Sequence, residues 1–151
     1  MVSLEGSNPS ISTNIIMKVE VNRRSSNDKE WQELKKFVDQ RDKHRCRMQF
    51  CMSIKEAHQM KIPEGKDVKN LDHAHIFSAG AEPSLIYNKK NVVLLSRGFH
   101  RRMDNYLDPV TGEPIDLAHH YYWWYRIYHK STEPYNPEKD YRSLLKEEIS
   151  E

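Results

Sequence analysis

Residues 71–106 constrain the fold most, because they combine two short apolar strands with a helix. LDHAHIF and NVVLL are the strand candidates, and the loop between them, SAGAEPSLIYNKK, contains a glycine and a proline. Short β-rich runs bounded by such turn residues predict strands, so we expect a hairpin with a long connection. The sequence from Ser96 to about Tyr106 predicts a helix. This strand–loop–strand–helix order indicates an α+β domain.

Side chains that carry chemistry gather in this window. They include three histidines, two carboxylates and one amide, namely Asp72, His73, His75, Asn91, His100 and Asp104. His100 and Asp104 are four residues apart, which places them on one face of the predicted helix, within reach of a single ion. Arg97, Arg101 and Arg102 flank them. A metal ion beside arginines suits phosphodiester chemistry, in which phosphate charge is neutralised and the leaving group is polarised.

The run AHIFSAGAEPSLIYNKKNVVLLSRGFHRRMDNYLDPVTGE resembles the HNH endonucleases, especially their small phage and bacterial members. The likeness extends upstream through RDKHRC and covers about residues 31–113. It implies a ββα-metal core at about residues 70–106, in which a hairpin and a helix hold one divalent ion. It also implies a hydrolase that cleaves phosphodiester bonds in DNA, with double-stranded DNA as the expected partner, and that leaves 5′-phosphate and 3′-hydroxyl ends.

The resemblance implies a role for each residue of its motif. A strand histidine is the general base for the attacking water, and Asn91 fixes the loop and orients that imidazole. His100 and Asp104 hold the ion, Mg²⁺ or Mn²⁺, which binds a phosphate oxygen and the leaving 3′ oxygen. The candidate phosphate contacts are Lys89, Lys90, Arg97, Arg101 and Arg102.

Two histidines compete for the role of base. The pair Asp72 and His73 matches relatives in which a metal ligand directly precedes the base, whereas HIFSAG matches relatives that place the base at His75. We favour His75, which puts Ala74 at the ligand position, a departure from the fuller motif. Asp72 lies two residues earlier on the same strand face as Ala74 and is expected to supply the missing ligand.

Ala74 keeps a second function class open. A catalytically inactive HNH-fold module that binds nucleic acid is the alternative to an endonuclease. A structural metal protein without affinity for nucleic acid is a third reading, which the arginines of the window disfavour. Sequence specificity, nicking against double-strand cleavage, oligomeric state and biological role stay open at this point.

The two cysteines do not complete a zinc knuckle. Four residues separate Cys46 from Cys51, where a knuckle has two, and Ser96 and Phe99 occupy the positions of the second cysteine pair of many relatives. His58 adds at most a third ligand. We therefore expect buried free thiols and no structural Zn²⁺.

Helices are predicted on both sides of the window. SSND supplies capping side chains and the apolar positions of WQELKKFV recur at helical spacing, so an amphipathic helix is expected to end near Arg41. RDKHRCRMQFC breaks that period and predicts a short extended segment, followed by a helix around residues 54–60. After the turn DPVTGEP we expect an aromatic-rich helix over about 115–129, with its rings mainly in the core and one face free for DNA.

The two ends of the chain carry weaker signals. Residues 1–16 are rich in Ser and Asn and lack periodicity, which predicts a disordered leader before a domain over 17–130, with Met17 as an alternative start. Residues 131–151 hold six acids and three bases, an acidic tail that we expect to form a solvated helix around 141–149.

Charge and hydropathy exclude some classes of protein. The net charge of +2 does not by itself indicate a nucleic-acid partner. No run reaches the roughly 20 apolar residues of a membrane span, so we expect a cytoplasmic protein without a membrane partner. The histidines outside the window are expected to be surface or hydrogen-bonded residues without a chemical role, namely His44, His58, His119, His120 and His129.

Overall fold

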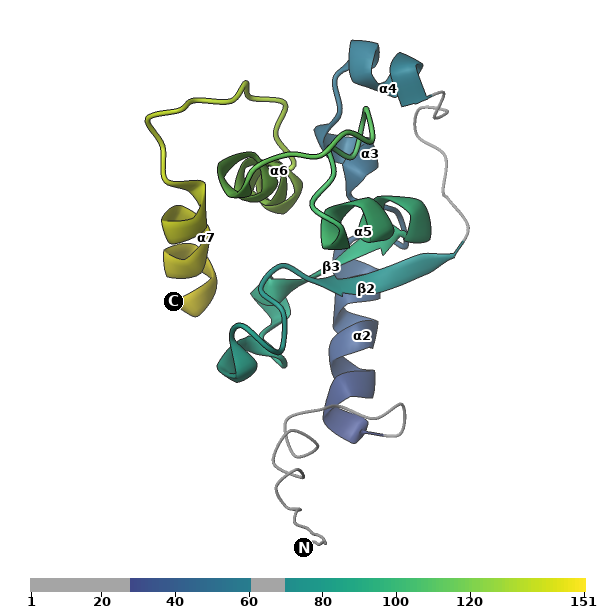
Figure 1. Ribbon diagram of the computed structural model, residues 1–151. Coiled ribbons are helices and arrows are strands. Elements are labelled where there is room, and N and C mark those ends of the chain that lie inside the picture. The colour runs from purple at the N-terminus through teal and green to yellow at the C-terminus, as the bar shows by residue number, and fades with distance from the viewer. Residues whose placement is uncertain (1–27, 61–69) are drawn as a thin grey trace, which may run out of the picture.

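The computed structural model describes residues 28–60 and 70–151 and shows helices around a two-stranded antiparallel sheet, an α+β arrangement (Figure 1). In chain order the elements are α2 (Lys29–Arg41), α3 (Met48–Cys51), α4 (Ile54–Met60), β2 (Leu71–His75), the 3-10 turns η1 (Pro83–Leu85) and η2 (Lys89–Asn91), β3 (Val92–Ser96), α5 (Arg97–Asp104), α6 (Leu117–His129) and α7 (Tyr141–Ser150). The predicted leader 1–16 and Met17 lie outside the described residues. No helix in the described ranges is long and apolar enough to cross a membrane.

The hairpin and the helix after it lie where the sequence predicts them. β2 and β3 pair antiparallel, with Leu71 opposite Ser96 and His75 opposite Val92. Every residue of β3 is buried, because α5 packs on one side of the hairpin and α2 on the other (Figure 1). Successive residues of β2 point to these two sides in turn. The sheet therefore has an α5 face and an α2 face.

The predicted amphipathic helix is confirmed as α2. Asp28 is its N-cap, and the Asp28 carboxylate accepts the backbone N–H of Glu30 at 2.9 Å. The buried stripe that packs against β3 consists of Trp31, Leu34 and Val38. Phe37, which the periodicity assigns to the same stripe, is 41% exposed, because it lies on the flank of the helix.

The prediction of an extended segment at RDKHRCRMQFC is wrong, because the structure has a turn followed by the short helix α3. Buried Arg47 explains the difference. Its guanidinium donates to the carbonyl oxygen of Ile127 at 3.0 Å and to that of Tyr128 at 2.5 Å, and it binds the Asp42 carboxylate at 2.9 Å. These contacts tie the segment to the end of α6, and the local sequence pattern does not reveal them.

α6 and α7 form the other half of the core. Trp123 and Trp124 are buried in α6, so the assignment of the aromatic helix to the core is confirmed. α7 is helical as expected, but it is not simply solvated. Its inner face packs beside α6 through Tyr141, Leu145 and Ile149, which are buried (Figure 1).

Candidate metal and nucleic-acid site

The α5 face of the hairpin carries all three predicted metal ligands. Asp72 lies on β2, and its Oδ2 is 2.9 Å from Nδ1 of His100 on α5. The other ring nitrogen of His100, Nε2, is 3.4 Å from Oδ2 of Asp104, one helical turn later. Arg97 at the start of α5 donates to Oδ1 of Asp72 at 3.2 Å. These residues form a continuous chain from strand to helix.

The charge on Asp72 determines which nitrogen of His100 carries the proton. Burial raises the pKa of Asp72, but the hydrogen bonds from His100 and Arg97 outweigh it and hold the pKa below its usual range. An ionised carboxylate can only accept, so Nδ1 of His100 is the donor. In the neutral ring the lone pair is then on Nε2, which faces Asp104. Metal-binding histidines in proteins use this arrangement, with a carboxylate on the far nitrogen.

The two carboxylates nevertheless lie against opposite nitrogens of one ring. For this reason Asp72, His100 and Asp104 do not converge on a point. No group of three His, Cys, Asp or Glu residues in residues 28–60 and 70–151 is arranged to share one ion. The arrangement therefore offers two groups that could coordinate a metal ion, Nε2 of His100 and the Asp104 carboxylate, and one carboxylate, Asp72, on the far side of the ring.

The strand histidines occupy the α2 face instead. His73 Nε2 is 2.7 Å from Oδ1 of Asp39 on α2, and His75 Nε2 is 2.9 Å from the carbonyl oxygen of Ile86. Trp31 packs against both rings, edge-on to His73 at 6.1 Å between centroids and stacked on His75 at 5.5 Å. Five of the six residues that the sequence groups in one window are thus divided between two faces of the sheet, and the sixth, Asn91, lies in the turn η2 before β3.

Asn91 ties together the loop that joins the strands. Its side chain is completely buried, accepts the N–H of Phe77 at 2.8 Å and donates to the carbonyl oxygens of Phe77 at 2.9 Å and Leu85 at 3.1 Å. The carbonyl of the next residue, Ile86, is the one that accepts from His75. Asn91 therefore holds the segment whose Ile86 carbonyl accepts from the His75 imidazole.

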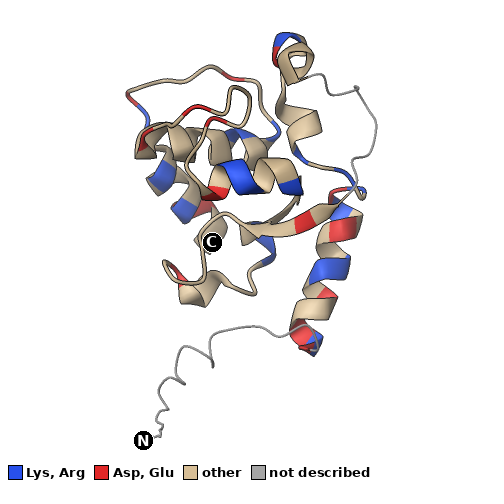
Figure 2. Cartoon of the chain, turned by 45° about the vertical axis from the view of Figure 1, so that its right-hand side comes forward, with Lys and Arg blue, Asp and Glu red and all other residues tan. Residues whose placement is uncertain are grey.

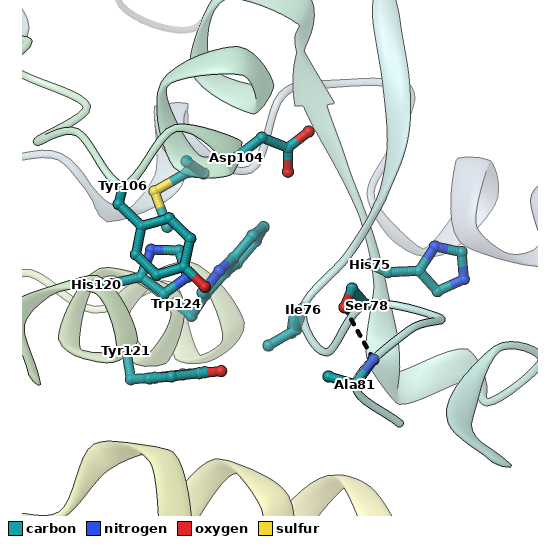
Figure 3. Close-up of a pocket in the computed structure, with 10 residues that line it drawn as sticks. His75, Ile76, Ser78, Ala81, Asp104, Tyr106, His120, Tyr121 and Trp124 are labelled. Atoms are coloured by element: carbon teal, nitrogen blue, oxygen red, sulfur yellow. Dashed lines mark hydrogen bonds between the residues drawn. The ribbon is translucent and has the colours of Figure 1, made fainter. Parts of the chain in front are cut away.

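One cavity of about 240 Å³ lies between this loop, the end of α5 and α6. Asp104 and His75 both border it, and His73 is not among its described lining residues. Figure 3 shows Asp104 on one side of the cavity and His75 on the other, with the imidazole of His75 pointing away from it. The bond to the Ile86 carbonyl places the ring proton of His75 on Nε2, because a carbonyl oxygen only accepts.

The arginines of α5 have different surroundings. Arg97 pairs with Asp72, yet its side chain is 53% exposed. Arg102 donates to the carbonyl oxygen of Pro109 at 2.7 Å and so supports the turn that follows α5. Arg101 is exposed. Two of the three predicted phosphate contacts on this helix therefore remain open to solvent beside His100.

The two lysines before β3 contact elements other than α5, namely α2 and the end of α7. Figure 2 shows further basic residues on both α5 and α2. The ammonium of Lys89 is 4.6 Å from the ring centroid of Phe37. Lys90 Nζ donates to the backbone oxygen of Glu151 at 3.0 Å, at the end of α7. Lys90 thus binds the C-terminal end of a helix, where a cation is favoured.

The ligand position next to His75 is filled by the core. Ala74 has no exposed surface and packs in the same cluster as Phe99 and Met103 of α5. Asp72, one strand repeat away, reaches the helix near His100 instead. Ala74, where the sequence departs from the fuller motif, is therefore a buried apolar position with no room for a metal ligand.

The surroundings of His120 differ from the expectation of a surface or hydrogen-bonded histidine. This residue is 5% exposed, and its Nδ1 atom is buried without a hydrogen-bond partner among the described residues. Burial lowers the pKa of His120 to about 4, so the ring is neutral at pH 7. The available signal was its place in the buried stripe of the aromatic helix, four residues before Trp124.

The cysteines are buried free thiols, as predicted. Burial raises the pKa of Cys51 to about 12 and also raises that of Cys46. The sulfur of Cys46 already accepts the backbone N–H of Ser96 at 3.2 Å. Zinc binds thiolates, so two thiols held in the protonated form are poor ligands.

No family model, curated protein or solved structure matches this chain. The likeness to the HNH endonucleases therefore depends on the motif residues and on the order of β2, β3 and α5.

Proposed function

We propose that this protein is a metal-dependent HNH-type endonuclease that hydrolyses phosphodiester bonds in DNA on a ββα-metal core made of β2, β3 and α5. The chain from Asp72 through His100 to Asp104 supports this proposal most. It fixes an imidazole by a carboxylate on Nδ1 and presents Nε2 to a second carboxylate 3.4 Å away. Solvent reaches that second carboxylate, because the side chain of Asp104 is 65% exposed.

His100 Nε2 and Asp104 are the residues that would hold the ion in this proposal. Asp72 orients His100 from behind instead of binding the ion itself, because its contact is with Nδ1. Mg²⁺ and Mn²⁺ suit so small a set of protein donors, since Mg²⁺ usually keeps several waters and binds through one or two carboxylates plus substrate phosphate. When bound, the ion neutralises charge on the phosphate and on the leaving oxygen.

His75 is the better of the two candidate bases. Its Nε2 proton is engaged by the Ile86 carbonyl, so Nδ1 is the atom that would take the proton of the attacking water. It also lines the cavity that Asp104 lines, although its imidazole points away from that cavity (Figure 3). The Nε2 atom of His73 is instead engaged by the Asp39 carboxylate, 2.7 Å away. Arg97 and Arg101 would bind the phosphate in this proposal, since both side chains are open to solvent beside His100.

A second candidate function is the inactive nucleic-acid-binding module. Two observations favour it. Ala74 fills a ligand position with a buried methyl group, and the imidazole of His75 lies on the opposite face of the sheet from His100. Such a protein would bind DNA with an affinity that falls with salt and would not cleave it.

Cleavage of supercoiled plasmid distinguishes the two. We expect nicking with Mg²⁺ or Mn²⁺ and none with EDTA. Removing the base in His75→Ala should lower the rate about 100-fold or more, and His100→Ala should lose cleavage at every metal concentration. His73→Ala is the matched control and should retain the wild-type rate. No cleavage with any metal, together with salt-dependent binding, would establish the inactive module.

Asp72→Asn tests the assignment of Asp72 as the residue behind His100. Loss of a carboxylate in this position typically lowers metal affinity by about 10- to 100-fold. We therefore expect Asp72→Asn to need more Mn²⁺ for half-maximal cleavage and to recover the wild-type rate at saturation. If saturation does not restore the rate, Asp72 acts as a direct ligand.

A further inference from the structure

The cavity beside Asp104 has an aromatic wall that the proposed chemistry does not use. Tyr106, His120, Tyr121 and Trp124 line it opposite the loop after β2 (Figure 3). The residues lining it that the structure describes include one carboxylate, Asp104, and no Lys or Arg. Such a wall suits a flat, uncharged group better than a phosphate.

His120 supplies an unused polar atom in this wall. It is 95% buried, and its Nδ1 finds no hydrogen-bond partner among the described residues. Buried polar atoms in proteins are nearly always bonded, so an exception calls for an explanation such as a bound partner. The ring is fixed by stacking on Tyr106, with centroids 4.0 Å apart and planes 16° apart.

Tyr106 lies at the mouth of the cavity in an unfavourable backbone conformation. Its φ of 57° is in the left-handed region, which disfavours a residue with a large side chain. Its side chain lies over His120 and is 45% exposed (Figure 3). The conformation belongs to the end of α5, because Tyr106 follows the Asn105 C-cap and its N–H donates to the carbonyl oxygen of Met103 at 3.1 Å.

We propose that this cavity binds one unpaired nucleobase of the DNA, next to the phosphate at Asp104. The base stacks on Tyr106 and directs its hydrogen-bonding edge to Nδ1 of His120. This inference rests on the proposed function for the identity of the ligand as DNA. It predicts that the protein prefers duplexes with an unpaired nucleotide to fully paired duplexes.

Size and protonation agree with a base as the occupant. Drug-sized ligands occupy pockets of roughly 300–1,000 Å³, so a cavity of about 240 Å³ takes a smaller group such as a single heterocycle. Burial lowers the pKa of His120 to about 4, and a neutral imidazole offers one donor and one acceptor. A base edge matches this pair, whereas a phosphate would favour a cationic ring.

An unpaired nucleotide enters such a cavity more readily than a paired one, because extruding a paired base requires unstacking and loss of its pairing. Stacking on one aromatic ring contributes about 1–3 kcal/mol per base, which corresponds to roughly 5- to 150-fold in affinity. We therefore expect the dissociation constant for a duplex with a one-nucleotide bulge to be about tenfold lower than that for the matched duplex.

The test measures binding to a duplex with 2-aminopurine at the bulge and to a fully paired duplex, both in EDTA. We expect tighter binding of the bulged duplex and quenching of its fluorescence. His120→Phe keeps the ring and removes the nitrogen, and Tyr106→Ala removes the stacking surface. Both should bind the two duplexes within about twofold of each other, the expected result for loss of one contact of this size.

His119→Phe is the matched control, because His119 is adjacent on α6 but packs on Tyr135 outside the cavity. It should retain the preference. Thermal unfolding should show that His120→Phe is folded, since it removes an unsatisfied buried atom. Equal affinity of the wild-type protein for both duplexes, or equal behaviour of His119→Phe and His120→Phe, would overturn the inference. Because binding is measured without metal, a bulge preference without plasmid nicking contradicts only the proposed nuclease.

Discussion

The two faces of the hairpin each carry a histidine–aspartate pair, but the pairs differ in what surrounds them. On the α5 face, Asp72 holds His100 so that the free end of the ring meets an exposed second carboxylate. On the α2 face, Asp39 holds His73 against the side of Trp31. A histidine–aspartate pair alone therefore does not indicate a metal-binding site. In the proposed function, the second carboxylate and the neighbouring arginines are what would let the α5 face hold a cation and a phosphate.

Both faces depend on the same short strand. Asp72 and Ala74 point to α5, whereas His73 and His75 point to α2, since side chains alternate along a strand. A shift of register by one residue would exchange the two sets. Contacts at the edges of the hairpin hold this register. We expect their removal to cause the largest losses of stability.

Asp42 anchors the α2 face, and its loss should have the largest effect on stability. Its buried carboxylate binds Arg41 and Arg47 and accepts the N–H of Leu94 in β3 at 3.0 Å. Removing one partner of a buried ion pair costs about 3–5 kcal/mol, so we expect Asp42→Ala to lower the free energy of unfolding by that amount at pH 7. Urea unfolding measures it. Asp39→Ala, which breaks a partly exposed pair, is the control and should change stability by less than about 1 kcal/mol.

The stability lost in Asp42→Ala should depend on pH. Burial raises the pKa of Asp42, but the hydrogen bonds and charges of Arg41 and Arg47 outweigh it and leave the pKa below its usual range. A lowered folded-state pKa stabilises above the unfolded value of about 3.9 and loses that contribution as the pH falls through the folded value. The stability difference between wild type and Asp42→Ala should therefore shrink below about pH 4. A constant difference down to pH 2 would contradict this account.

Asn91 closes the other end of the hairpin, where a smaller loss is expected. Truncation to alanine leaves one buried N–H and two buried carbonyl groups without their partner, at positions 77 and 85. We expect Asn91→Ala to cost about 3 kcal/mol, since each unsatisfied buried group costs about 1–3 kcal/mol and water reaches some of them on relaxation. Thermal unfolding should show a Tm lower by roughly 10 °C. Asn88→Ala, at a partly exposed neighbouring amide, should lose much less, and equal losses would remove Asn91 from its assigned role.

Local patterns predicted the elements that build the site, and distant contacts account for what they missed. Capping and periodicity locate α2 and α5, and β-rich runs between turn residues locate the strands. The turn at Arg47 could not be predicted, because its partners in α6 lie 80 and 81 positions along the chain.

The candidate site was only partly predictable for a related reason. Spacing identifies His100 and Asp104 as neighbours, and strand alternation already implies that Asp72 and His73 face opposite sides. Their proximity in sequence nonetheless suggests one common site. Only the positions of α2 and α5 show that Asp72 contacts His100 and that His73 contacts Asp39. The Nδ1 atom of His120 lacks a partner among the described residues because of how the helices pack. Periodicity predicts that this residue is buried, but it does not predict that the nitrogen has no hydrogen bond.

The smallest effect is expected at the His73–Asp39 pair, which makes the α2 face resemble the α5 face. The His73–Asp39 pair is partly exposed, with side chains 20% and 31% accessible, so a double-mutant cycle should give a coupling below about 1 kcal/mol. We expect Mn²⁺ to leave that coupling unchanged, because no second carboxylate lies beyond His73 among its described contacts. The coupling between His100 and Asp72 should instead increase with Mn²⁺, since an ion on Nε2 makes the Nδ1 proton a stronger donor to Asp72. Thermal unfolding of both cycles with Mn²⁺ and with EDTA measures this, and an equal response of the two pairs would mean that neither face is specialised for a metal ion.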